Sequence, residues 1–364
     1  MNIQLNSLVP IHEATLRFCA GTDPALEWAA RGVSGYDADD DAKSRLEKYD
    51  EKAKDPATFL KDGPEKERLG HLLETATRFF HEYNSGVNVG ERHFCNNDFI
   101  FIVGITRSGG TYLLTQLLEA NGIDYRHLSL SMVHDGIPSY AYMLDSLTVP
   151  MRYVAAAFEF FQFLAWAQEA FDGRGTVVQK RIGYAHWLPQ LDAILGDASI
   201  YIVTIRNPLH CFGSVVDLDA AAFGLEGGSI LRCYLRSDMP NAGRWLQVVQ
   251  KYHDVSAREW ERLNAGQQFL RYWEAYYREF ANTPGLKGRL VPLAYGDAYR
   301  RYIEENYPEF SKGKPGALTT SRRNYEVIKE YFGLSESMVD EAVANVATDW
   351  ERNGLVFPTG EILA

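Results

Sequence analysis

The sequence predicts an α/β fold in which helices flank both faces of a mostly parallel sheet. Short apolar runs rich in β-branched and aromatic residues recur along the chain, and segments with helical spacing follow most of them. Continuous apolar strands that alternate with helices are typical of parallel sheets buried on both faces. Ligands bind such sheets at the carboxyl ends of the strands. The residues that follow each apolar run are therefore the first candidates for function.

The predicted strands share this apolar character and occupy residues 99–105, 176–182, 199–205 and 289–295. Segments with helical spacing follow the first three strands, at residues 111–122, 186–197 and 206–218. The last of these helices has clear start signals, because Asn207 can cap it and Pro208 suits its first turn. Strands and helices thus alternate in the order that a parallel sheet requires.

Residues 1–95 are expected to form an N-terminal helical extension that packs on a catalytic domain of residues 96–364. The mixed charge blocks in the extension are typical of solvated helix faces. Residues 153–171 are the most apolar candidate for a membrane span, but Glu159 and Glu169 interrupt them. We therefore expect a buried helix there, and no membrane partner.

The composition disfavours several classes of function. A formal net charge of -11 argues against a nucleic-acid partner, because such proteins usually carry a basic excess. The first residues lack the pattern of a secretion signal, which predicts a cytoplasmic location. The cysteines lack the close spacing of zinc or redox sites, so we expect free thiols and no metal. They are Cys19, Cys95, Cys211 and Cys233.

A glycine-rich turn, Gly104-Ile-Thr-Arg-Ser-Gly-Gly-Thr111, follows the first predicted strand. A loop between a strand and a helix can aim backbone N–H groups at a phosphate. Its spacing mimics the P-loop of nucleotide-binding enzymes, but Gly110 stands where that motif has its lysine. Phosphate transfer from ATP or GTP is therefore disfavoured. Arg107 instead places a cation inside the loop, where it can hold a terminal anionic group and stabilise charge on a leaving oxygen.

A second motif, Arg206-Asn-Pro-Leu-His-Cys-Phe-Gly-Ser214, follows the strand predicted at residues 199–205. Its arginine ends the strand, and its serine lies about two helical turns into the next helix. At this spacing Arg206 and Ser214 can approach one phosphate from two sides. Taken alone, the two residues could equally cap a neighbouring element and pack within a helix.

Together, GITRSGGTYL and IRNPLHCFGS resemble the two signature segments of PAPS-dependent sulfotransferases of the cytosolic and bacterial types. The likeness covers roughly residues 97–300 and implies a P-loop-like fold. It also implies the donor 3′-phosphoadenosine 5′-phosphosulfate (PAPS) and the product adenosine 3′,5′-bisphosphate. The 3′-phosphate would be held by Arg206 and Ser214. The 5′ end would be held by consecutive loop residues, namely Arg107, Ser108, Gly109, Gly110, Thr111 and Tyr112.

The loop departs from the family pattern at Thr106, where many relatives have proline, and at Gly110, where many have threonine. These departures change the number of side-chain hydroxyls in the loop and leave its backbone cradle intact. The acceptor is expected to be a small molecule with a hydroxyl or an amine, and the sequence does not name it.

Sulfuryl transfer needs an in-line nucleophile, charge stabilisation and a base for the acceptor proton, and the singly charged sulfuryl group does not demand magnesium. His186 is the first candidate base, because an imidazole titrates close to neutral pH. Lys180 should emerge at the carboxyl end of its strand, where it can stabilise the sulfuryl oxygens or the bridge oxygen. By resemblance, relatives have a lysine and a histidine here, at a spacing about two residues shorter. His134 is the second candidate base, in a segment suited to a substrate loop.

A basic run late in the chain contains Arg322 and Arg323. The resemblance implies that one of them reaches the 3′-phosphate, whereas a plain solvated charge run is the alternative.

Two other functions remain open: a non-catalytic nucleotide-binding or scaffold protein, and a P-loop small-molecule kinase. The kinase explains only the glycine-rich turn, and it would require a lysine before Thr111 and an Mg²⁺-binding aspartate. The oligomeric state is left open by the sequence.

Overall fold

The structure is a computed structural model. It describes residues 11, 13–21, 27, 40–53, 63–124, 128–134, 149–171, 174–186, 188–223, 246–283, 285–286, 288–311 and 329–363. The chain divides into two compact units. The first unit comprises Met1–Ile102, Thr111–Gly183 and Gln190–Ile200. The second unit comprises Val103–Gly110, Tyr184–Pro189 and Tyr201–Ala364.

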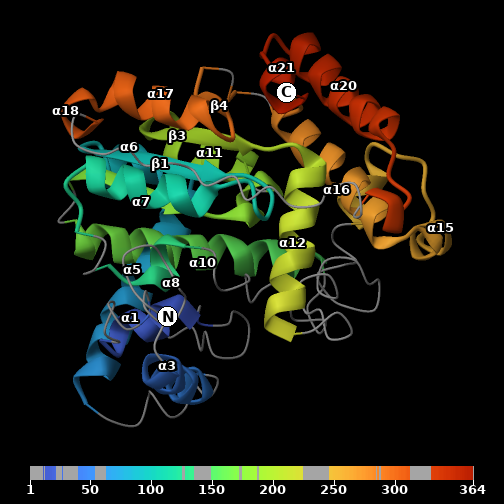
Figure 1. Cartoon of the computed structure of the whole chain (residues 1–364). Coiled ribbons are helices and arrows are strands. Elements are labelled where there is room, and N and C mark those ends of the chain that lie inside the picture. Colours follow the sequence, from blue (N-terminus) through green and yellow to red (C-terminus); the bar gives the residue numbers. More distant parts are fainter. Residues whose placement is uncertain are drawn as a thin grey trace. The chain divides into compact units, whose positions relative to one another are not determined.

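Four parallel strands form one sheet in the order β2-β1-β3-β4, and helices flank it (Figure 1). The strands are β1 (Asn97–Val103), β2 (Gly175–Lys180), β3 (Ser199–Ile205) and β4 (Leu290–Ala294). All four overlap the predicted ranges, so the predicted α/β fold with a parallel sheet is confirmed. In the inner strands β1 and β3, every residue except Asp98 and Ile200 is buried, which explains their continuous apolar sequences.

The register of the strands sets where their following residues lie. Ile205 at the end of β3 is level with Ala294 at the end of β4. Ile102 near the end of β1 is level with Lys180 at the end of β2. Within each pair, the residues that follow the two strands therefore emerge side by side at the same edge.

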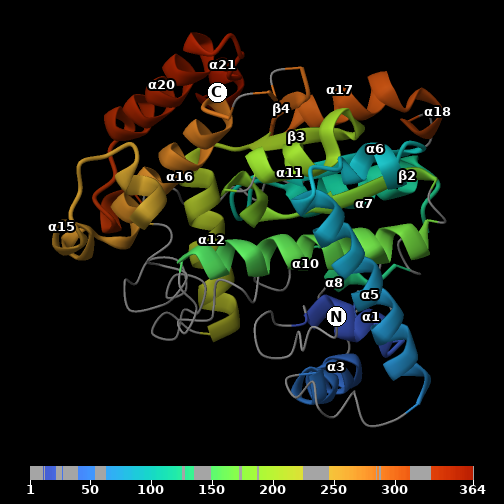
Figure 2. The same cartoon turned by 180° about the vertical axis from the view of Figure 1, so that it is seen from behind.

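The first unit is built around a long helix pair. Its helices are α1 (Glu13–Cys19), α3 (Asp40–Ala53), α5 (Pro64–Asn84), α6 (Val89–His93), α8 (Leu130–Val133), α10 (Val149–Ala170), and most of α7 (Gly110–Ala120) and α11 (Leu188–Leu195). Helix α10 packs against α5, and the two helices cross in both views (Figure 1, Figure 2). The predicted buried helix at residues 153–171 is confirmed by α10, whose aromatic side chains are buried: Phe158, Phe160, Phe161, Phe163 and Trp166. Helix α1 contacts α5, α8 and α10, so the described part of the N-terminal region belongs to this core.

The second unit carries β4, most of β3 and of η3, and the remaining helices. They are α12 (Pro208–Phe223), α15 (Ala257–Arg262), α16 (Ala265–Ala281), α17 (Asp297–Asn306), α18 (Pro308–Ser311), α20 (Glu336–Arg352) and α21 (Thr359–Leu363), with a 3₁₀ turn, η3 (Ile182–His186). Helix α12 begins as predicted, with Pro208 in its first turn and the Leu209 N–H donating to Asn207 Oδ1 over 2.9 Å. Helix α16 starts with a capping box formed by Asn264 and Gln267.

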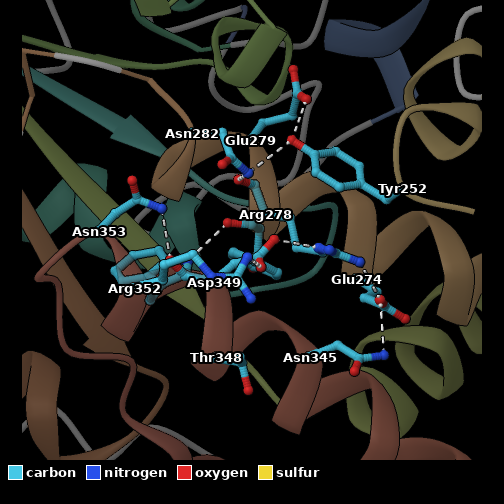
Figure 3. A network of polar contacts seen from close by, with 12 residues as sticks. Tyr252, Glu274, Arg278, Glu279, Asn282, Asn345, Thr348, Asp349, Arg352 and Asn353 are labelled. Atoms are coloured by element: carbon cyan, nitrogen blue, oxygen red, sulfur yellow. Dashed lines mark hydrogen bonds and ion pairs between the residues drawn. The ribbon is translucent and has the colours of Figure 1, made fainter.

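A polar network joins α16 to α20 (Figure 3). Arg278 lies at its centre and donates to Asp349 Oδ2 over 2.7 Å and to Glu274 Oε1 over 3.0 Å. Asn345 also donates to Glu274 Oε1, over 3.1 Å. Both carboxylates are buried, and each is compensated by charge-assisted hydrogen bonds. This network anchors α16 next to Trp273 and Tyr277, which directly precede Glu274 and Arg278 in the chain.

Within the described ranges, no helix is both long and apolar enough to serve as a membrane span. Three of the cysteines, Cys19, Cys95 and Cys211, are free thiols as predicted, and Cys233 lies outside the described residues.

Candidate functional site

The glycine-rich loop (residues 104–109) joins β1 to α7 through a tight turn of the second unit. Ser108 N–H donates to the Ile105 carbonyl over 3.1 Å and closes the turn. A side chain on Gly104 would collide with Thr204 and Ser108, so only glycine fits there. Gly109 has a φ of 95°, and a Cβ on it would lie 2.5 Å from the Tyr295 ring. The glycines therefore allow the loop to pass close to β3 and to the end of β4.

Three of the predicted binding residues lie together in this unit. Arg107 Nε donates to Ser214 Oγ over 2.9 Å. Arg206 Nη1 donates to the backbone carbonyl of Arg107 over 3.1 Å. The three residues come from the loop, the residue after β3 and the second turn of α12, so separate elements deliver two guanidinium groups and one hydroxyl to the same place. We call this set the arginine cluster (Arg107, Arg206 and Ser214).

Arg206 is held at its backbone carbonyl and at its guanidinium group. Trp273 of α16 donates from Nε1 to the Arg206 carbonyl over 3.0 Å. The guanidinium carbon lies 4.4 Å from the centre of the Tyr295 ring. Arg206 Nε is buried and has no hydrogen-bond partner among the described residues. A buried charged donor without an acceptor is costly, so this edge of the guanidinium suits an anionic ligand.

Ser108 shapes the loop through both of its polar groups. Its hydroxyl lies 2.8 Å from Thr204 Oγ1, and its carbonyl accepts a hydrogen bond from Tyr299 over 2.7 Å. Tyr277 of α16 donates to the Thr204 carbonyl over 2.7 Å, and its hydroxyl accepts the Ile105 N–H over 3.4 Å. The end of β3 and the start of the loop are thus tied to the same buried tyrosine.

The first unit holds a second group of predicted residues. Thr111 Oγ1 lies 2.8 Å from His134 Nε2. The backbone of His134 forms a parallel β-bridge with Lys180, the last residue of β2. Gln179 donates from Nε2 to the Met132 carbonyl and so anchors the short helix α8 that precedes His134. We call Thr111, His134 and Lys180 the histidine group. Thr111 directly follows the loop, because Gly110 and Thr111 are the first two residues of α7.

The titratable neighbours of the arginine cluster, His210 and Cys211, are uncharged at neutral pH. Burial, followed by the positive charge of Arg206, lowers the pKa of His210 below its usual value. Burial raises the pKa of Cys211 to about 12, although Arg206 and Arg107 oppose this rise. At neutral pH the imidazole and the thiol are therefore both uncharged, and the guanidinium groups supply positive charge for an anion.

The other predicted residues are placed only in part. Tyr112 lies in the first turn of α7 and is half-buried. The backbone of His186 ends η3, and its side chain is outside the described structure. Arg322 and Arg323 lie outside the described residues. Among the residues that the structure describes, no group of three or more His, Cys, Asp or Glu side chains is arranged to hold a metal.

Sequence reasoning missed the supporting residues of the arginine cluster: Thr204, Trp273, Tyr277, Tyr295 and Tyr299. Tyr295 was within reach, because it ends a predicted strand at the edge where ligands bind. The others gave no local signal.

The chain was also compared with known proteins, and no protein-family model, curated protein or solved structure matches it.

Proposed function

We propose that this protein is a sulfotransferase that moves a sulfuryl group from PAPS to a hydroxyl or amine of a small-molecule acceptor. One observation carries the proposal: the arginine cluster gathers two guanidinium groups and a buried hydroxyl beside a glycine-rich strand-to-helix loop. Such a cluster suits a ligand with several anionic groups. We assign the 3′-phosphate to Arg206 and Ser214, and the 5′-phosphosulfate to the loop from Arg107 to the start of α7.

The cation supplied by this loop distinguishes the proposal from a kinase. The position before Thr111 is Gly110, so no side chain is available there to reach a β- or γ-phosphate. The charge comes instead from Arg107, whose exposed side chain extends to Ser214 of α12. A guanidinium there can neutralise the phosphate oxygen that becomes the leaving group when the sulfuryl group departs.

In the proposed reaction, the acceptor oxygen or nitrogen forms a bond to sulfur while the bond between sulfur and the bridging phosphate oxygen breaks. The bridge oxygen keeps the electron pair and becomes part of adenosine 3′,5′-bisphosphate. The acceptor proton passes to a protein base, so atoms and charges balance without a further reactant. His134, whose Nε2 lies 2.8 Å from Thr111 Oγ1, is one candidate for this role. His186 stays the other candidate base, and Lys180 a candidate for stabilising the sulfuryl oxygens.

The test is the binding of adenosine 3′,5′-bisphosphate, measured by calorimetry against 5′-AMP and ATP. We expect a clear preference for the bisphosphate, and a loss of about 1.5–3 kcal/mol in its binding free energy in Arg206→Ala, the scale of a charge-assisted contact. Arg258→Ala, an exposed arginine of α15, is the matched control and should bind normally. Equal or absent binding of the bisphosphate would reject the proposal.

A second assay separates catalysis from simple binding. PAPS is incubated with the protein and a panel of phenols, alcohols and amines, and release of the bisphosphate is followed. Turnover with any acceptor supports the enzyme. Tight bisphosphate binding without turnover across the panel would instead favour the non-catalytic nucleotide-binding protein, and a preference for ATP would favour the kinase.

A further inference from the structure

Tyr295 and Tyr299 contact the two parts of the proposed donor site, which are Arg206 and the glycine-rich loop. Tyr295 follows β4, and its backbone N–H donates to the Ile205 carbonyl over 2.7 Å, which places it beside the first residue after β3. That residue is Arg206, whose guanidinium lies over the Tyr295 ring. Tyr299, in the first turn of α17, donates to the Ser108 carbonyl and packs edge-on against Tyr295 with ring centres 5.8 Å apart.

The same two rings also border the glycine-rich loop. A Cβ on Gly109 would lie 2.5 Å from Cδ2 of Tyr295 and 3.1 Å from Cε2 of Tyr299. The rings therefore occupy the space that any larger loop residue would need. Tyr299 is fully buried, with its hydroxyl bonded to the loop, whereas Tyr295 is half-buried with one face against the guanidinium.

We propose that Tyr295 and Tyr299 are positioning residues for the donor site: Tyr295 fixes the plane of the Arg206 guanidinium, and Tyr299 fixes the loop at Ser108. This inference rests on the proposed function, which assigns the 3′-phosphate to Arg206. A guanidinium stacked on an aromatic face loses little further freedom when it binds a phosphate. With Nη1 bonded to the Arg107 carbonyl and the guanidinium stacked on Tyr295, the orientation of the Arg206 side chain is fixed.

The two tyrosines have different chemical roles, so different atoms matter. Tyr295 acts through its ring, and Tyr295→Phe should therefore retain the function, whereas Tyr295→Leu should lose it. Tyr299 acts through its hydroxyl, so Tyr299→Phe should already loosen the loop. Tyr331, an exposed tyrosine on the same unit, provides the control substitution Tyr331→Leu.

The experiment is a double-mutant cycle on nucleotide affinity. We expect Tyr295→Leu to weaken binding of adenosine 3′,5′-bisphosphate about tenfold, the scale of a cation–π contact, and to leave the binding of 5′-AMP almost unchanged. In an Arg206→Ala background, the same substitution should have no further effect, because the group that it positions is gone. A purely structural role for the tyrosine would lower affinity for both nucleotides equally and additively.

A second measurement uses the unsubstituted protein and needs no nucleotide. The Arg206 Nε–H proton, assigned with Arg206→Lys, should resonate upfield of ordinary arginine values because of the Tyr295 ring current. An unshifted resonance would overturn the inference even if Tyr295→Leu failed to fold. If the unsubstituted protein prefers the bisphosphate but Tyr295→Leu does so equally, this inference alone is wrong. If the unsubstituted protein binds no bisphosphate, the proposed function falls with it.

Discussion

Arg107 reaches Ser214 from a left-handed backbone: its φ is 69°, and its Nε donates to Ser214 Oγ over 2.9 Å. Every other described residue with a positive φ is a glycine. A bulky residue in this region costs about 1–2 kcal/mol relative to the right-handed form. Glycine would remove that cost, and Gly109 and Gly110 already follow closely in the sequence. An arginine at this strained position therefore points to a role for its guanidinium that outweighs the strain.

This relationship predicts opposite effects on stability and binding at one position. Arg107→Ala removes the guanidinium but keeps the strain, whereas Arg107→Gly removes both. We expect both variants to bind adenosine 3′,5′-bisphosphate about tenfold or more weakly, the scale of one charge-assisted hydrogen bond. The free energy of unfolding should be higher for the glycine variant than for the alanine variant, by up to about 1 kcal/mol. Calorimetric titration and urea denaturation measure the two quantities.

The control for this pair is Arg258→Ala on α15, which should change neither property. Normal bisphosphate affinity in both Arg107 variants would show that the side chain serves only to bond Ser214.

The histidine group leads to a second prediction, on catalysis. His134→Ala should leave bisphosphate binding intact and lower turnover by ~10² or more, the usual contribution of a general base. His186→Ala is the matched variant, and the larger loss identifies the base. Thr111→Val should reduce turnover less than His134→Ala, since it removes only the hydroxyl that lies 2.8 Å from Nε2. Near-normal turnover in both histidine variants would place the base elsewhere.

The sequence was sufficient for the sheet because strand signals are local. The apolar run at residues 199–205 is β3 itself, and Asn207 and Pro208 mark the start of α12 as expected. The motifs also located Arg206 and Ser214, since a strand end and a helical turn have known geometry. The end of the predicted strand and the start of the next helix were therefore enough to expect both residues near one edge of the sheet.

The contacts within the site were not predictable, because they join residues far apart in the chain. Trp273 binds the Arg206 carbonyl, and Tyr299 binds the Ser108 carbonyl, across 67 and 191 residues respectively. Such pairs depend on the register of β3 against β4 and on how α16 packs, and no local pattern encodes either. The pairing of Thr111 with His134 likewise depends on the path of the chain between α7 and α8.

The last residues of the described chain support the second motif and give a third prediction. Asn207 Nδ2 donates to the Ile362 carbonyl of α21 over 3.1 Å, and Arg301 of α17 bonds Glu361 over 3.0 Å. Removal of residues 359–364 should therefore free Asn207 and weaken bisphosphate binding several-fold, with a stability loss of about 1–2 kcal/mol. Glu361→Ala is the control, because an exposed ion pair contributes little. Unchanged affinity in the shortened protein would limit α21 to a role in packing.

The polar network of α16 leads to a prediction on pH dependence. His253 Nε2 lies 3.4 Å from Glu274 Oε2, a contact that favours protonation. Burial and the positive charges of Arg271 and Arg278 outweigh it and lower the His253 pKa to about 4. In the unfolded chain this pKa returns to about 6.5. Between these two values the unfolded state binds the proton and the folded state does not.

The sign follows from this difference in proton binding. As the pH falls from 7 to 5, His253 alone should lower the free energy of unfolding by about 2 kcal/mol. Burial raises the pKa of Glu274, which acts in the opposite direction and offsets part of this loss. His253→Gln removes the histidine contribution and keeps Glu274, so its free energy of unfolding should fall less between pH 7 and 5. Urea denaturation of both proteins at the two pH values measures this, and an equal fall in both would show that His253 is not kept neutral by the fold.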